Sequence, residues 1–143
     1  MKTPVRQTST PAGYSGTPLP RKLGIKPGAR VGLLGAPEGF EATLGDLPEG
    51  TRLLRGRKGP HDLTLWFTTS RRRLEQGIAA RAASLGRDGL WIAWPKKSSG
   101  AATDLSEGDV RRTGLEAGLV DFKICAIDAT WSGLKFTRRR TGR

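Results

Sequence analysis

The segment Arg30-Val-Gly-Leu-Leu-Gly-Ala-Pro-Glu-Gly-Phe40 runs from an apolar stretch of strand length directly into a turn that contains two glycines. Further along, residues 61–67 and 90–94 are continuous apolar runs, the pattern of strands that are covered on both faces of a parallel sheet. Residues 70–85 and 106–118 carry apolar side chains at helical spacing. Strands that alternate with helices predict an α/β fold with right-handed crossovers.

Four shorter elements complete the predicted sheet. Residues 38–47 fit a short helix and residues 51–54 a short strand. Residues 120–127 and 134–137 are strands separated by a short turn, which indicates an antiparallel hairpin. We therefore expect a small Rossmann-like three-layer sandwich, with a mostly parallel sheet and a C-terminal antiparallel hairpin.

The chain of 143 residues is predicted to hold a single α/β domain over 21–137. Residues 1–20 are rich in Thr, Ser, Pro and Gly, so we expect a disordered tail there. Residues 138–143 carry several arginines and are predicted to form a basic C-terminal tail, which would add non-specific affinity for polyanions.

The chain is strongly basic. It carries 25 Lys and Arg against 13 Asp and Glu, a formal net charge of +12. Such a charge favours anionic partners: nucleic acid, phosphorylated metabolites or acidic protein surfaces. The alternative, a basic protein without any such partner, stays open.

Two side chains limit metal and thiol chemistry. The single cysteine, Cys125, lies in an apolar run and is expected in the core, and the single histidine, His61, leaves no His/Cys metal cluster. We expect His61, beside Asp62, to be structural rather than a catalytic base. The start of the sequence has no apolar signal region and no apolar run approaches the length of a membrane span, so we expect a cytoplasmic protein that does not enter membranes.

The order of these elements over about 26–137 is similar to class I S-adenosylmethionine-dependent methyltransferases with one early strand–helix pair missing. Four motifs also resemble a family of small bacterial proteins classed as a domain of unknown function. They are Gly13-Tyr-Ser-Gly-Thr-Pro-Leu19, Lys22-Leu-Gly-Ile-Lys-Pro-Gly28, Leu90-Trp-Ile-Ala-Trp-Pro-Lys96 and Gly118-Leu-Val-Asp-Phe-Lys-Ile-Cys-Ala-Ile-Asp128, the last followed by Trp131-Ser-Gly-Leu-Lys135. The second resemblance implies a relative but no activity.

The glycine turn departs from the methyltransferase pattern, which implies a GxGxG-like turn and an acid at the end of the second strand. Here Gly35 and Gly39 are four residues apart, Pro37 removes a backbone donor, and the second strand ends in Arg55. We therefore expect a structural turn and no cofactor, with S-adenosylmethionine and dinucleotides disfavoured.

Cations follow the second, third and fourth predicted parallel strands, and ligands of open parallel sheets bind beyond the carboxyl ends of the strands. Arg71, Arg72 and Arg73 occupy the first turn of a helix, where the helix dipole disfavours cations and a bound anion would favour them. The alternative, that the three side chains are solvated and the unfavourable interaction is screened, stays open. Trp131, in the last turn, is a candidate stacking platform. The predicted anion-binding residues are Arg55, Arg57, Lys58, Arg71, Arg72, Arg73, Lys96, Lys97, Ser98 and Trp131.

The carboxylates of Asp128 and Glu38 could act as bases at this edge, although capping and turn roles compete. The sequence favours a non-catalytic binding module for an anionic partner. The alternatives are an enzyme acting on a phosphorylated or carboxylated small molecule, a degenerate methyltransferase, and an adaptor for an acidic protein. The oligomeric state stays open.

Overall fold

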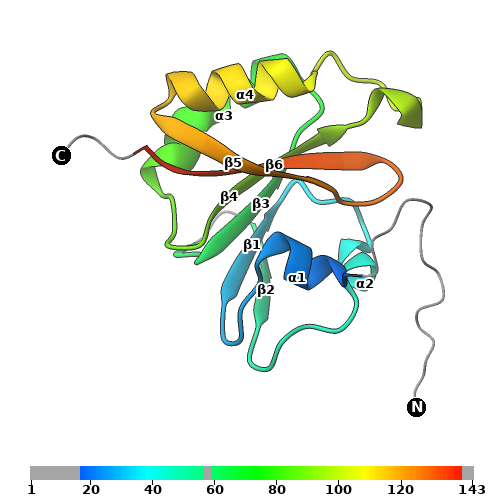
Figure 1. The fold of residues 1–143 in the computed structure, drawn as a ribbon, viewed down its shortest axis with the longest axis vertical. Helices are drawn as coiled ribbons and strands as arrows, with labels where there is room; N and C mark the ends of the chain where they lie inside the picture. Colours follow the sequence, from blue (N-terminus) through cyan, green and yellow to red (C-terminus); the bar gives the residue numbers. More distant parts are fainter. Residues whose placement is uncertain (1–16, 57–58, 140–143) are drawn as a thin grey trace.

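The computed structural model describes residues 17–56 and 59–139, which form one mixed sheet flanked by helices (Figure 1). In chain order the elements are α1 (Leu19–Leu23), β1 (Arg30–Leu34), α2 (Phe40–Leu44), β2 (Arg52–Arg55), β3 (Leu63–Phe67), α3 (Arg71–Ala83), β4 (Gly89–Pro95), the 3₁₀ turn η2 (Lys97–Ser99), α4 (Glu107–Glu116), β5 (Leu119–Ala126) and β6 (Trp131–Arg138).

The strand order in the sheet is β2-β1-β3-β4-β6-β5. The pairs β1–β2, β1–β3 and β3–β4 are parallel, whereas β6 is antiparallel to both β4 and β5. Helices α1 and α2 lie on one face of the sheet, and α3 and α4 on the other (Figure 1). The predicted three-layer α/β sandwich with a C-terminal antiparallel hairpin is confirmed.

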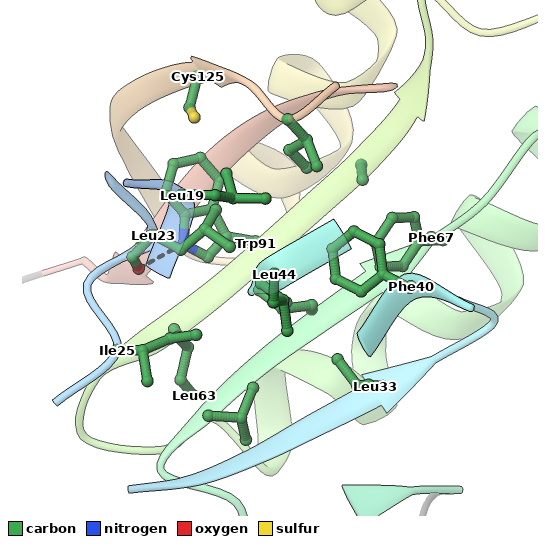
Figure 2. Packing of buried hydrophobic residues seen from close by; sticks show 14 of the residues in the cluster. Leu19, Leu23, Ile25, Leu33, Phe40, Leu44, Leu63, Phe67, Trp91 and Cys125 are labelled. Atoms are coloured by element: carbon green, nitrogen blue, oxygen red, sulfur yellow. Dashed lines mark hydrogen bonds between the residues drawn. The ribbon is translucent and has the colours of Figure 1, made fainter. Parts of the chain in front are cut away.

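The face under α1 and α2 is an apolar core that includes Leu23, Phe40 and Phe67 (Figure 2). The indole Nε1 of Trp91 donates a hydrogen bond to the carbonyl oxygen of Leu23 over 2.8 Å, drawn as a dashed line in Figure 2. The buried ammonium of Lys135 donates to the same oxygen over 3.2 Å. These two donors attach the last residue of α1 to β4 and β6.

Helix α1 lies partly inside the segment predicted as a tail. Leu19 and Pro20 are buried, so the ordered domain begins before the predicted boundary at residue 21. At the other end, Arg138 belongs to β6 and the Arg139 amide donates to the Gly118 carbonyl, so the domain also extends past residue 137. The predicted tails at 1–16 and 140–143 lie outside the described residues.

Both long helices begin at the predicted caps. The Ser70 side chain accepts a hydrogen bond from the Arg73 amide, and Ser106 forms a reciprocal capping box with Asp109. Helix α2 is shorter than the predicted 38–47, because Gly39 and Gly45, at φ of 82° and 76°, flank it in conformations that do not continue a helix.

The closing hairpin and the aromatic core follow the predictions with one shift. Strand β6 begins at Trp131, so the turn after β5 is shorter than the predicted 128–133.

Trp91 and Trp94 are buried, and Trp66 is half-buried under α3. Cys125 is buried in the core, and this burial raises the pKa of its thiol. Among the described residues, no helix combines the length and apolar character needed to cross a bilayer.

Candidate functional site

The carboxyl ends of five strands meet at one edge of the sheet. Strands β1 to β4 are parallel, and β5 runs in the same direction because both β5 and β4 pair antiparallel to β6. This edge, which we call the carboxyl edge, carries the glycine turn after β1, the end of β2, the β3–α3 loop, the η2 turn and the β5–β6 turn. Ligands of open α/β sheets bind at this edge.

The turn after β1 requires glycine at its first position. Gly35 has φ of 68°, and a Cβ placed there would lie 2.7 Å from the Phe67 carbonyl oxygen. A side chain at this position would therefore be strained and would collide with the end of β3. The turn therefore lies tightly against the end of β3.

Arg55 at the end of β2 fastens this turn. Its Nη1 and Nη2 donate to the carbonyl oxygens of Ala36 and Pro37 over 3.0 and 2.8 Å. Its Nε and Nη2 also donate to the two carboxylate oxygens of Glu41 over 2.7 and 3.0 Å. The guanidinium is thus engaged by the turn and by α2, and its charge is balanced locally rather than offered to an outside anion.

The Glu41 carboxylate lies beside the end of β2, where the methyltransferase pattern has an acid and this sequence has Arg55. The Arg55 guanidinium lowers the pKa of Glu41 from 4.5 to about 2, so this group is ionised at any physiological pH. The Glu41 side chain is 43% exposed, and each carboxylate oxygen has lone pairs beyond those that Arg55 uses. Helix α2, and not β2, therefore supplies the acid beside the glycine turn. Sequence reasoning missed this residue because it lies on another element.

Three aromatic rings line the same edge. Phe40 meets Phe67 edge to face at a centroid distance of 4.8 Å, and Phe67 meets Trp131 in the same way at 5.0 Å. Phe40 and Phe67 are buried, while Trp131 is half-buried. The indole of Trp131 therefore lies at the edge with part of its surface open to solvent, next to the core.

Carboxylate side chains of the same chain contact the first turn of α3. The Asp104 carboxylate accepts a hydrogen bond from the Arg71 amide over 2.7 Å, and Asp109 lies 3.7 Å from the Arg71 guanidinium. The sequence predicts an anion among Arg71, Arg72 and Arg73, and the structure places two carboxylates from the α4 side of the chain there. Arg72 and Arg73 are exposed.

The other predicted site residues also lie along the carboxyl edge. Lys96 is half-buried after β4, and Lys97 and Ser98 are exposed in η2. Asp128 accepts hydrogen bonds from the amides of Thr130 and Trp131 over 2.8 Å each, which is the turn role that competes with catalysis. Glu38 is exposed beside the glycine turn.

Two predicted site residues, Arg57 and Lys58, lie outside the described residues. The described remainder forms two groups along the edge. One is the glycine turn with Arg55 and Glu41, and the other is the cationic loops after β3 and β4. Trp131 stands at the start of β6, whose pairing with β4 places it opposite Pro95.

Comparison with solved structures identifies methyltransferases of the same fold. A magnesium protoporphyrin IX methyltransferase from Synechocystis PCC 6803 with bound SAH aligns with a TM-score of 0.53 at 12% identity, over 78% of this chain and 75% of that one. A SAM dependent methyltransferase from Aquifex aeolicus aligns with a TM-score of 0.56 at 13% identity, over 81% of this chain and 85% of that one. No protein-family model and no curated protein matches the sequence.

These neighbours confirm the methyltransferase-like order of elements. They also correct one prediction, because the departures of the glycine turn and of Arg55 led us to expect no cofactor and to disfavour S-adenosylmethionine. One neighbour holds SAH and the other is SAM dependent, so a ligand of this type was wrongly set aside. The resemblance to the bacterial family of unknown function stays a prediction, since no family model matches.

Proposed function

We propose that this chain is a methyltransferase-fold domain whose carboxyl edge binds a nucleoside ligand of the S-adenosylmethionine type. The observation that carries the proposal is the Glu41 carboxylate, ionised and partly exposed beside the glycine turn, where it is held by Arg55. The fold shared with two methyltransferases supports the same edge as the binding position.

Each part of such a ligand has a chemical counterpart at the edge. Ribose hydroxyls are donors and would bind an ionised carboxylate such as Glu41. A flat base would stack on an aromatic ring that is partly exposed, the property of Trp131. The ligand's own carboxylate would favour the cations after β4, Lys96 and Lys97. When bound, S-adenosylmethionine supplies an activated methyl group, and this chain's residues bind and orient it.

Isothermal titration with S-adenosylhomocysteine tests the proposal. Glu41→Gln removes the charge that would hold the ribose hydroxyls, and we expect affinity to fall about tenfold or more, the usual cost of losing hydrogen bonds to a charged group. Glu107→Gln is the matched control, because Glu107 is another exposed acid paired with an arginine, 2.9 Å from Arg111, on the opposite face of the sheet.

Three results decide the test. Binding that Glu41→Gln weakens and Glu107→Gln leaves unchanged supports the site. Binding that both variants leave unchanged places the ligand elsewhere on the chain and refutes it. The wild-type protein failing to bind S-adenosylhomocysteine at millimolar concentration also refutes it.

A second candidate function, binding of a polyanion such as nucleic acid, is favoured by the exposed cations of the carboxyl edge. Arg72, Arg73 and Lys97 are exposed, and the whole chain carries a net charge of +12. A gel-shift series at rising salt should then give a log–log slope of about −0.9 for each phosphate contacted. Replacing Arg72 and Arg73 by Gln should weaken binding more than deleting 140–143, which also removes two arginines. Equal losses would point to net charge alone and contradict a local site.

A further inference from the structure

Strand β5 is an edge strand with exposed apolar side chains. The strand order places β6 on one side of β5 and no strand of the sheet on the other, which we call the β5 edge. Phe122 and Ile124 of this strand are 57% and 52% exposed, and they are the large apolar residues that the described part of the chain leaves open to solvent. An eight-residue edge strand with such side chains is a template for pairing with another chain.

The two apolar side chains lie on opposite faces of the sheet. Ile124 pairs with Leu134, which belongs to the core under α3 and α4, and directly opposite residues of antiparallel strands share a face. The Phe122 ring lies 5.6 Å from Nζ of Lys135, whose ammonium binds the Leu23 carbonyl on the α1 face. An extended segment along the β5 edge would therefore meet apolar surface on both faces.

The backbone of Ile124 points away from β6. The Ile127 amide donates to the Trp131 carbonyl over 2.9 Å, which closes the hairpin and sets the alternation of the ladder. Cys125 and Ile127 thus direct their backbone groups toward β6, whereas the amide and carbonyl of Ile124 point outward. In the described part of the chain, no other segment forms a hydrogen bond with them. An added strand would find one donor and one acceptor there.

The α1 side of the β5 edge is basic. Lys123 is exposed on β5, and its Nζ donates to the Lys22 carbonyl of α1 over 2.8 Å. Between described residues, no ion pair joins Lys123 to a carboxylate. Asp121, the acid of β5, lies 2.9 Å from Arg111 and is paired within the chain. Burial, the largest cause, and the nearby charge of Lys123 lower the pKa of Lys135, so an added carboxylate would relieve a repulsion here.

Charge distinguishes the occupants that an edge strand can take. A second copy of the chain would bring two Lys123 side chains together, between molecules that each carry a net charge of +12. Residues 1–16, which precede α1, contain Lys2 and Arg6 and no acid. Neither occupant supplies negative charge, whereas an acidic segment of another protein does.

We propose that the β5 edge binds an extended acidic segment of a partner protein, which adds to the sheet as a further strand, independently of the carboxyl edge. Acidic side chains of the segment contact Lys123 beside Phe122, and the apolar side chains that alternate with them pack on Ile124. The amide and carbonyl of Ile124 form backbone hydrogen bonds with the added strand. The chain thereby gains a protein-docking surface separate from the site proposed for a nucleoside.

Two end-blocked peptides of alternating sequence are the probes, one of Glu and Val and the other of Lys and Val. They share length and apolar side chains and differ in the sign of their charge. Added to the full chain, the acidic peptide should bind at submillimolar to millimolar concentration and slow hydrogen exchange of the Ile124 amide about tenfold or more. The basic peptide should not bind. Backbone NMR measures both effects.

Two charge reversals locate the site. Lys123→Glu replaces an attraction by a repulsion and should weaken binding of the acidic peptide about tenfold or more. Arg52→Glu is the matched control, because it changes the net charge by the same amount at an exposed position on β2, the opposite edge strand. This control should bind nearly as the wild type does.

A third variant tests the added strand itself. Ile124→Pro removes the outward amide, which the ladder between β5 and β6 does not use, so it should abolish binding while the melting temperature changes little. If this variant does not fold, the two charge reversals and the exchange of the Ile124 amide still decide the proposal.

Protection of the Ile124 amide by the acidic peptide, together with weaker binding in Lys123→Glu but not in Arg52→Glu, supports the proposal. It is overturned if the acidic peptide does not bind at millimolar concentration, if both reversals weaken binding equally, or if the Ile124 amide is not protected. Two further results would overturn it and assign the β5 edge to another occupant. One is a dimer mass that Lys123→Glu changes, and the other is binding of single-stranded oligo(dT) at Lys123 while the peptide does not bind.

Discussion

Replacing Trp91 by Phe should destabilise the domain by detaching α1 from the sheet. The Trp91 side chain is fully buried, and its Nε1 reaches the Leu23 carbonyl over 2.8 Å between residues 68 positions apart. Loss of this buried hydrogen bond costs about 1 kcal/mol, and the space left by the smaller ring costs roughly 1–2 kcal/mol more. Lys135 still donates to the same carbonyl over 3.2 Å, so the oxygen keeps one partner.

The expected total is about 2–3 kcal/mol in the free energy of unfolding, or roughly 4–10 °C in melting temperature for a chain of this length. Urea denaturation followed by far-UV circular dichroism measures it, because this signal does not depend on the tryptophan that is removed. Trp94→Phe is the control. Trp94 is also buried in β4, but its indole forms no hydrogen bond with the described residues.

Trp91→Phe should therefore cost about 1 kcal/mol more than Trp94→Phe, and amide hydrogens of α1 should exchange faster in that variant alone. If the two variants lose the same stability, the hydrogen bond to Leu23 contributes nothing. The reasoning about α1 would then be wrong.

Three further changes test other parts of the structure. Arg55→Met should raise the pKa of Glu41 from about 2 toward its ordinary 4.5, which an NMR titration of the carboxyl carbon measures; an unchanged pKa would show that Arg55 is not its cause. Ser106→Ala removes the cap of α4 and should lower the free energy of unfolding by about 1 kcal/mol in urea titrations, whereas a loss below a few tenths would contradict the capping box. Burial lowers the pKa of Lys135 from 10.5, so between the lowered value and 10.5 the unfolded chain binds more protons than the folded one. The free energy of unfolding should therefore rise with pH across that window, and Lys135→Met should abolish the rise. A rise that persists in the variant would assign it to another group.

Elements with local sequence signals could be predicted. Ser70 and Ser106 cap their helices because the capping side chain and the amide that it accepts are three residues apart, so the pattern is visible in a short window. The apolar runs that became β3 and β4 were equally plain. Helix α1 was missed because it has only five residues, and contacts with Trp91 and Lys135, far along the chain, hold it.

The sequence was enough to predict the position of the candidate site in the fold, but not which residues pair within it. Topology alone predicts that the loops after β1 to β5 share an edge. The partners within that edge are set by tertiary contacts: Arg55 pairs with an acid on α2, and the Arg71 amide pairs with Asp104, 33 residues away. Both pairings convert predicted ligand groups into internal ones. The close packing of the His61 ring on Gly32 and of the Trp66 ring on Gly77 likewise follows no spacing rule.

The attachment of Arg55 has a consequence for motion. Strand β2 has four residues at the margin of the sheet, with a neighbour on one side only, so it would ordinarily be among the first parts to fray. Its terminal guanidinium also binds the glycine turn and α2, so opening of the strand and loosening of the turn are one event. A ligand that binds the glycine turn should therefore also stabilise β2. The deuterium uptake of the four β2 amides would then fall on binding.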